Sequence, residues 1–211
     1  MLPGEPKFRR RKAARPDEIV HAALQVFAER GFAAAKLDEI ARRAGVSKGA
    51  LYLYFETKED LFRAVVERAI APNVAVVRTM AAAHPGPFSD LIRGIAAHIA
   101  GVVEATPIGG VAKMVIAEAR NFPEIARIWH DELIAHALGA LADAIANAQK
   151  RGEVRPGDPR AYALELIAPL LVSVLWRETF VPIGAPAFDI PKLVQQHVET
   201  MLRGMSTEAA A

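Results

Sequence analysis

The segment from Leu37 to Phe55, LDEIARRAGVSKGALYLYF, constrains the fold of this chain more than any other. Read at the helical period, it is two short helices, each with one apolar face. Gly45 stands where the first helix must end, in a position that favours the left-handed backbone glycine adopts easily. Ser47 follows at the right distance to cap the second helix. Because helices this short need neighbours to bury their apolar faces, the segment predicts a helix-turn-helix, a motif whose second helix normally enters the DNA major groove.

Helix signals continue along the chain and predict an all-α fold of about nine helices. A first helix begins near Pro16 and ends at Gly31. Thr57 and Asp60 are spaced as a capping box at the start of a further helix, which Pro72 must kink or end. Breaks rich in proline and glycine separate later helices, expected near 88–104, 111–120, 123–151, 160–180 and 189–203. We find no strand-like alternation bounded by hairpin turns.

The helix-turn-helix segment and its flanks resemble a known family. The stretch from about Asp17 to Phe62 is similar to the N-terminal domain of the tetracycline-repressor (TetR) family of transcriptional regulators. The similarity lies in the motifs GF, an IA pair, AGVSKGALYLYF and TKEDL. The run EARNFPEIARIWHDE, from Glu118 to Glu132, resembles the C-terminal domain of the AefR-like group. This implies a three-helix DNA-binding domain at residues 16–60, followed by a helical effector-binding and dimerisation domain at 61–204.

The composition bears on the compartment of the protein and on its terminal segments. The chain has no cysteine, which excludes disulfides and thiolate sites and fits a reducing cytoplasm. No apolar run is long and uninterrupted enough for a bilayer, so we expect no membrane partner. Residues 1–15 are expected to form a basic, flexible arm, and two interpretations stay open: an arm that lies on DNA, or a solvated tail. Residues 205–211 are expected to fray.

Nine residues are candidates for contact with double-stranded operator DNA. Ser47, Lys48 and Gly49 open the second helix of the motif, where Gly49 lets the backbone approach DNA and Lys48 suits guanine or phosphate. Lys36 stands where the family usually has a capping threonine; lysine caps poorly, but its ammonium suits a phosphate. For Tyr54, packing against the preceding helix is an equal alternative. The full set is Lys36, Ser47, Lys48, Gly49, Ala50, Tyr52, Tyr54, Thr57 and Lys58.

The resemblance also implies a homodimer built by the last two helices. Two recognition helices about 34–36 Å apart would then read a palindromic operator. The apolar positions expected at the interface are Leu164, Ala168, Leu171, Val172, Leu175, Leu193, Val194, Val198 and Met201. The alternative is that these side chains face their own core. Because the helix at 160–180 is apolar almost all round, we expect it to serve both purposes.

The middle of the chain is expected to hold a pocket for a small hydrophobic effector, which would release the operator by moving the helix at 61–70. Large apolar side chains and nearby polar ones are the candidates, although each taken singly is more often a core or surface residue. They are His98, Met114, Glu118, Phe122, Trp129, Leu133, His136, Trp176 and Phe180.

Two other functions remain in view. The first is a DNA-binding regulator without a small-molecule effector; a cavity of a few hundred Å³ among the middle helices would favour a sensor, and a filled core would favour this alternative. The second, remote one is a helical metal-dependent enzyme. Glu132 and His136 share a helix face, but His130 points elsewhere, which leaves two ligands, too few for a closed site. We therefore expect no enzyme activity, catalytic residue, metal or cofactor.

We expect a repressor, although activation stays open because the position of the operator decides it. The effector, the operator sequence and the regulated genes are not specified by the chain.

Overall fold

The computed structural model describes residues 15–207, and these residues are all-α, as predicted. The N-terminal end consists of α1 (Arg15–Ala34), α2 (Leu37–Arg43), α3 (Lys48–Tyr52) and α4 (Lys58–Val65). The remaining elements are η1 (Val66–Ile70), α5 (Ala71–Ala83), α6 (Phe88–Ala105), α7 (Ile108–Glu118), α8 (Pro123–Trp129), η2 (His130–Ile134), α9 (Ala135–Lys150), α10 (Pro159–Thr179), η3 (Val181–Ile183) and α11 (Ile190–Met205). Because α4 continues through η1 into α5, and α8 through η2 into α9, these elements make nine continuous helical segments in the described part of the chain, apart from the short 3-10 helix η3.

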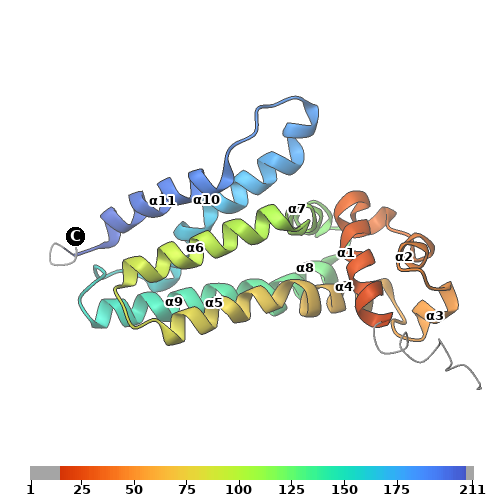
Figure 1. Ribbon diagram of the computed structural model, residues 1–211, viewed down its shortest axis with the longest axis horizontal. Helices are drawn as coiled ribbons and strands as arrows, with labels where there is room; N and C mark the ends of the chain where they lie inside the picture. The colour runs from red at the N-terminus through yellow and green to blue at the C-terminus, as the bar shows by residue number, and fades with distance from the viewer. Residues whose placement is uncertain (1–14, 208–211) are drawn as a thin grey trace, which may run out of the picture.

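The molecule is elongated, with α1–α4 at one end and the long helices α5, α6 and α9 running away from them (Figure 1). Helices α10 and α11 lie along this body, and the loop that joins them projects from it (Figure 1). One buried apolar cluster holds α1–α4 together and continues into α7 and α8. A second cluster fills the space between α5, α6, α9, α10 and α11. The first cluster therefore crosses the boundary expected at residues 60–61, which falls inside α4.

Local sequence signals set the ends of several helices. Gly45 has φ +67°, and the N–H groups of Gly45 and Val46 donate to the carbonyls of Arg42 and Ala41 at 3.2 and 2.9 Å, which is a Schellman motif. The backbone N–H of Ala50 donates to the Ser47 hydroxyl at 3.1 Å. At the start of α4, Thr57 and Asp60 form the reciprocal capping box that their spacing predicts. These expectations are confirmed.

The helix does not end at Pro72, which was one of the two outcomes expected there. A π-helical turn, η1, precedes the proline, and the N–H of Ala71 donates to the carbonyl of Val66. The wider turn relieves the clash between a proline ring and the preceding turn, and the Asn73 amide donates to the carbonyl of Ile70 at 3.1 Å. The helix then continues to Ala83. A matching turn, η2, lies in the long helix that follows Phe122 and packs against η1.

The C-terminal expectation is also corrected in part. Residues 205–207 do not fray: the side chain of Met205 is 1% exposed, and its carbonyl accepts from the N–H of Arg155 at 2.8 Å. Thr207 donates from its hydroxyl to the carbonyl of Gly152 at 2.7 Å. The predicted arm at 1–14 and the residues 208–211 lie outside the described part of the chain.

Candidate DNA-binding surface and ligand cavity

Helices α2 and α3 place one end of the motif outward on a buried support. Ile40, Ala41 and Leu51 are buried against α1 and α4, which fixes the angle between the two short helices. The first residues of α3 face away from this core: Ser47, Lys48 and Gly49 are exposed, and Ala50 is half-buried. Tyr52 and Tyr54 are 44% and 40% exposed. The surface therefore presents the N-terminus of α3, the part of a recognition helix that meets base edges.

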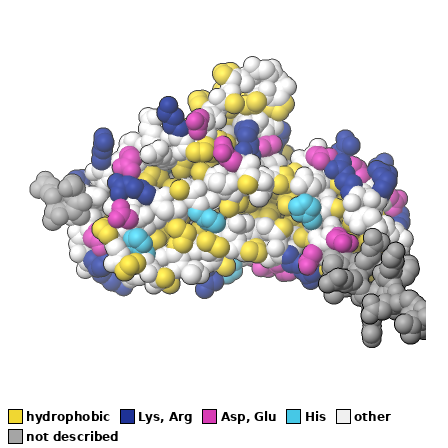
Figure 2. All heavy atoms as spheres, in the orientation of Figure 1, with side chains coloured by type: hydrophobic (Ala, Val, Ile, Leu, Met, Phe, Trp, Pro, Cys, Tyr) yellow, Lys and Arg dark blue, Asp and Glu magenta, His cyan; other side chains and the backbone are white. Residues whose placement is uncertain are grey.

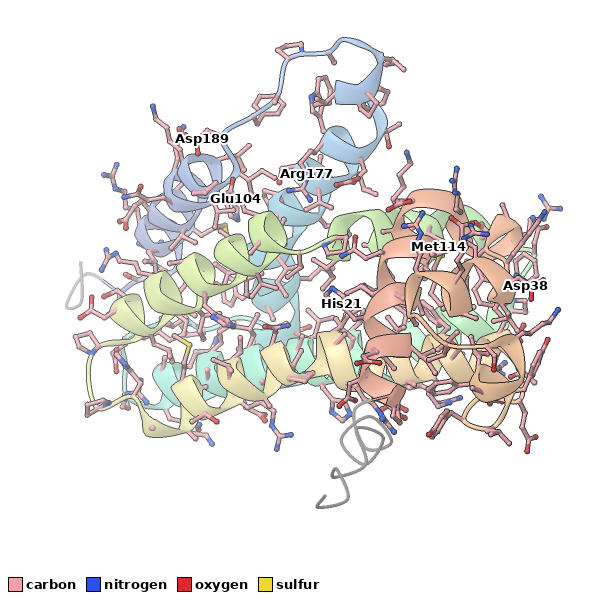
Figure 3. The ribbon with its side chains drawn as sticks, turned by 45° about the vertical axis from the view of Figure 1, so that its right-hand side comes forward. His21, Asp38, Glu104, Met114, Arg177 and Asp189 are labelled. Atoms are coloured by element: carbon pink, nitrogen blue, oxygen red, sulfur yellow. The ribbon has the colours of Figure 1, made fainter. Side chains whose placement is uncertain are left out.

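The two residues that open α3, Lys48 and Gly49, differ in their contacts within the free protein. The Lys48 ammonium lies 2.9 Å from the carboxylate of Asp38 on α2, and this carboxylate raises the pKa of Lys48. Figure 3 shows Asp38 at the outer end of the molecule. A Cβ added at Gly49 would meet nothing within 4 Å, and its φ is not positive. Since the fold does not demand a glycine there, its small size suits the approach of an outside surface.

The remaining candidates divide between the surface and the fold. Lys36 is exposed at the start of α2, and its side chain makes no capping hydrogen bond, as predicted. Thr57 is exposed, but its hydroxyl caps α4. Lys58 is half-buried and has contacts within its own chain: its ammonium donates to the carbonyl of Phe32 at 2.6 Å and lies 4.5 Å from the centre of the Phe32 ring. In the free chain its charge therefore caps the end of α1.

A residue that the sequence analysis placed elsewhere supports this domain from the other side. The Glu118 carboxylate at the end of α7 accepts from the N–H groups of Phe32 and Ala33 at 2.9 and 2.7 Å. Gly110 lets α7 approach closely, because a Cβ there would stand 3.0 Å from the carbonyl oxygen of Ala28 on α1. Figure 3 shows Met114 on this same helix, beside α1. Glu118 and its partners are more than 80 residues apart, so no local pattern identifies the contact.

An apolar cavity of about 180 Å³ lies among the middle helices. Of the predicted pocket residues, His98, Trp129 and Leu133 line it. The other residues that line the cavity were not predicted from the sequence. They lie on both π-helical turns and on α5, α6, α7, α9 and α10. They are Ile70, Asn73, Val74, Val77, Ile99, Val102, Val103, Ile108, Gly109, Ala112, Ile134, Ala137, Leu141, Ile167, Leu170, Leu171 and Val174. This is smaller than the few hundred Å³ that we expected of a sensor, but it is not a filled core.

The other six predicted pocket residues do not line this cavity. Met114 is buried in the N-terminal cluster, and the Phe122 ring lies 5.1 Å from that of Phe32. Glu118 is engaged with α1, as described above, and His136 is exposed on α9. Trp176 and Phe180 are 5.0 Å apart beside the α10–α11 loop, where the Trp176 indole donates to the carbonyl of Pro186. Helical periodicity finds apolar faces, but it does not say which neighbour each face meets.

A larger groove of about 740 Å³ between α6 and α11 has a different character. Small apolar residues form much of its floor, and four charged side chains border it, among them Arg93 and Glu199, whose guanidinium and carboxylate lie 2.6 Å apart. The hydrogen-bonded Glu199 carboxylate raises the pKa of Arg93, and the Arg93 guanidinium lowers the pKa of Glu199. The charged border distinguishes this groove from the cavity among the middle helices, whose wall, within the described residues, has no Asp, Glu, Lys or Arg.

The outer face of α10 is apolar and open in the single chain. Leu164 and Val172 are 57% and 63% exposed, and Leu171 is 39% exposed. By length and composition Pro159–Ile183 would also pass for a membrane span, and little of it is buried. Some apolar side chains also lie on the projecting loop (Figure 2), and Ile183, in η3 just after α10, is 79% exposed. Exposed apolar side chains gathered on one helix are typical of an interface.

The predicted interface residues are divided by the structure. Ala168, Leu175, Leu193 and Met201 are half-buried and keep surface for a partner. Val194 and Val198 need a correction, because they are 7% and 3% exposed and pack into the core of their own chain. They lie on the face of α11 that meets α6, so they have little area to offer a second subunit.

Comparison with known proteins agrees with this geometry. Residues 19–65 match the family described as bacterial regulatory proteins, tetR family, and residues 90–204 match the AefR-like transcriptional repressor, C-terminal domain. The HTH-type transcriptional repressor BepR of Brucella suis is 42% identical over 82 residues, which cover 38% of the present chain and 39% of that relative.

Solved structures of similar fold extend over most of the chain. The transcriptional regulator FadR from Bacillus subtilis in complex with stearoyl-CoA has a TM-score of 0.74 at 18% identity, covering 89% of this chain and 98% of that one. SmeT, the repressor of a Stenotrophomonas maltophilia multidrug efflux pump, in a complex with triclosan has a TM-score of 0.75 at 22% identity, covering 94% of each chain.

Proposed function

The chain belongs to the TetR family of bacterial transcriptional regulators, with an AefR-like C-terminal domain, and on that premise we propose that it is a homodimeric repressor that binds a palindromic operator and is released by a small hydrophobic effector. Membership in this family makes it a helix-turn-helix regulator and not an enzyme. Its place of action is the cytoplasm, where the operator lies.

Binding to DNA rests on the exposed start of α3. Ser47, Gly49 and the Lys48 ammonium meet the major groove, and Lys36 meets a phosphate near the start of α2. Lys48 exchanges its partner Asp38 for DNA, which is a small cost because both side chains are more than half exposed. With few base-reading side chains in the set, phosphate contacts and DNA shape supply much of the affinity.

A dimer through α10 supplies the second half-site. The apolar surface of α10 needs a cover, and a second copy of the same surface provides one of matching chemistry. Leu164 and Val172 form its centre, and Leu193 and Met201 of α11 border it. This arrangement joins two subunits as a four-helix bundle and leaves both copies of α3 free.

The observation that carries the effector response is that the cavity wall and the support of α4 share the same two π-helical turns. Ile70 of η1 and Leu133 of η2 line the cavity. The Arg63 guanidinium on α4 meets the Glu132 carboxylate on η2 at 3.2 Å and that of Glu124 on α8 at 3.4 Å. A ligand that changes the packing of these turns therefore shifts α4 and the spacing of the two α3 helices. The shift needs only a difference in ligand affinity between the two spacings.

Filling the cavity tests this function. In Ala137→Phe the new ring occupies the cavity, whereas Ala135→Phe puts the same ring on the exposed side of that helix. Operator binding and its reversal by a panel of apolar compounds are measured for both variants. We expect both variants to bind the operator and only Ala137→Phe to resist release. Equal release of both variants would place the effector site outside this cavity. No release of the natural protein by any apolar compound would favour a regulator without a small-molecule effector.

A further inference from the structure

The cavity among the middle helices presents almost no polar atom to a molecule inside it. Its wall consists mainly of aliphatic side chains, with the Trp129 ring beside them. Among the described residues, the wall contains no Asp, Glu, Lys or Arg. A molecule that enters the cavity therefore meets apolar atoms on nearly every side.

The polar side chains of the wall hold their polar atoms away from the cavity. Nε2 of His98 is completely buried, so no ligand atom in the cavity can reach it. The Asn73 amide donates to the carbonyl of Ile70 within its own helical segment, at 3.1 Å. Since the cavity as a whole has almost no polar surface, a hydroxyl, carbonyl or carboxylate of a ligand finds no partner there.

The part of the wall nearest the molecular surface is apolar as well. Leu171 is 39% exposed and is the one exposed side chain among the described residues that line the cavity. Its neighbour on α10, Val172, is 63% exposed, so this side of the cavity borders the apolar outer face of α10. A ligand group that points outward past Leu171 thus reaches the surface that a second subunit covers in the proposed dimer.

We infer that the ligand of this cavity is a small hydrocarbon, or a halogenated hydrocarbon, that carries no hydrogen-bonding group. This inference rests on the proposed function and narrows its hydrophobic effector to one chemical class. The cavity of about 180 Å³ sets the size at about one substituted benzene ring, since an apolar cavity of about 150 Å³ holds benzene.

The free energy of binding for such a ligand comes from the apolar surface that leaves water. A hydroxyl group on the ligand would lose its hydration without gaining a hydrogen bond in return, and this loss weakens binding. For a carboxylate the loss is far larger, because a charge would be buried without a counter-ion. The same wall that favours a hydrocarbon therefore discriminates against its polar analogues.

Three probes built on one ring test the inference: toluene, 4-methylphenol and 4-methylbenzoate. Their binding to the full-length natural protein is measured by calorimetry without DNA, and operator release is measured separately. We expect toluene to bind about tenfold or more tightly than 4-methylphenol, because the phenol buries a hydroxyl without a partner. We expect no binding of 4-methylbenzoate.

Ala137→Phe and Ala135→Phe locate the bound toluene. The new ring of Ala137→Phe fills the cavity, so toluene binding should be lost, whereas Ala135→Phe should bind toluene as the natural protein does. Operator affinity without ligand, measured for both variants, shows that each is folded. Unchanged binding of toluene to Ala137→Phe would place its site outside the cavity and overturn the inference.

The ranking of the probes decides the ligand class independently of any variant. If 4-methylphenol or 4-methylbenzoate binds as tightly as toluene and releases the operator, the inference fails while the proposed effector response stands. Failure of all three probes to bind overturns the inference as well. If toluene binds in the cavity but does not release the operator, the ligand class is supported, and the proposed effector response is the part that fails.

Discussion

The Glu118 carboxylate at the end of α7 accepts a hydrogen bond from the backbone N–H of Phe32 at 2.9 Å, just past the end of the regular part of α1. The other carboxylate oxygen accepts from Ala33. The Lys58 ammonium donates a hydrogen bond to the carbonyl of Phe32 in the same turn. The turn after Gly31 is thus held by one charged side chain on its N–H groups and by another on its carbonyls.

Removing the carboxylate should loosen the N-terminal domain from the body. We expect Glu118→Ala to lower the free energy of unfolding by about 1–3 kcal/mol, because two backbone N–H groups lose a charged acceptor. Urea denaturation measures this change. Glu104→Ala, at an exposed position on α6, is the matched control and should change stability by no more than about 0.5 kcal/mol. Equal effects of the two variants would show that the Glu118 contacts contribute little.

Gly31 and Gly45 make a second comparison. Both have positive φ, +79° and +67°, but a Cβ at Gly31 would stand 2.4 Å from Oε1 of Glu118, whereas one at Gly45 would meet nothing within 4 Å. We expect Gly31→Ala to destabilise the protein clearly more than Gly45→Ala, whose cost is about 1 kcal/mol. Adding Glu118→Ala to Gly31→Ala should cost less than the sum of the two single changes, because the second change removes the clashing atom. Strictly additive melting data would contradict the contact.

Lys58 and Lys48 should differ in kind. Lys58→Met removes the cap of α1, so we expect it to lower stability while leaving the dependence of operator affinity on salt unchanged. Lys48→Ala should leave stability nearly unchanged. Where the Lys48 ammonium contacts a phosphate and not a guanine, Lys48→Ala should also reduce the slope of log affinity against log salt by about one. Fluorescence anisotropy at several salt concentrations measures the slopes. A reduced slope for Lys58→Met would return that residue to the DNA surface.

The helix ends were predictable because their causes lie within a few residues. The Ser47 cap, the Thr57–Asp60 capping box and the left-handed Gly45 each need only a local pattern. Such signals act through hydrogen bonds within one turn, so the sequence suffices to identify them.

The long-range features were not predictable in the same way. Periodicity marks Val194, Val198 and Leu171 alike as apolar, but only packing decides that the first two face α6 and that Leu171 is 39% exposed. The role of Glu118 depends on a partner 86 residues away. The residues of the two π-helical turns have no distinctive sequence pattern that would identify such a turn. Their effect is nevertheless large, because they determine which side chains reach the cavity.

The apolar face of α10 gives a prediction about assembly. Val172 is 63% exposed and does not line the cavity, so Val172→Glu tests the surface without disturbing the ligand site. We expect this variant to be monomeric by analytical ultracentrifugation and to lose operator affinity, because a buried unpaired charge opposes association. Ile116→Glu changes a similarly exposed side chain on α7 and should stay dimeric. A dimer of undiminished affinity in Val172→Glu would place the interface elsewhere.

Selection of bound DNA from a random pool by the full-length protein tests the central claim most directly. We predict an enriched palindrome whose half-sites are centred about 10 base pairs or a multiple of that apart, bound with two chains per duplex. We also predict that Lys48→Ala weakens binding to it. Recovery of no common sequence, or of a single unrepeated site bound by one chain, would contradict the account.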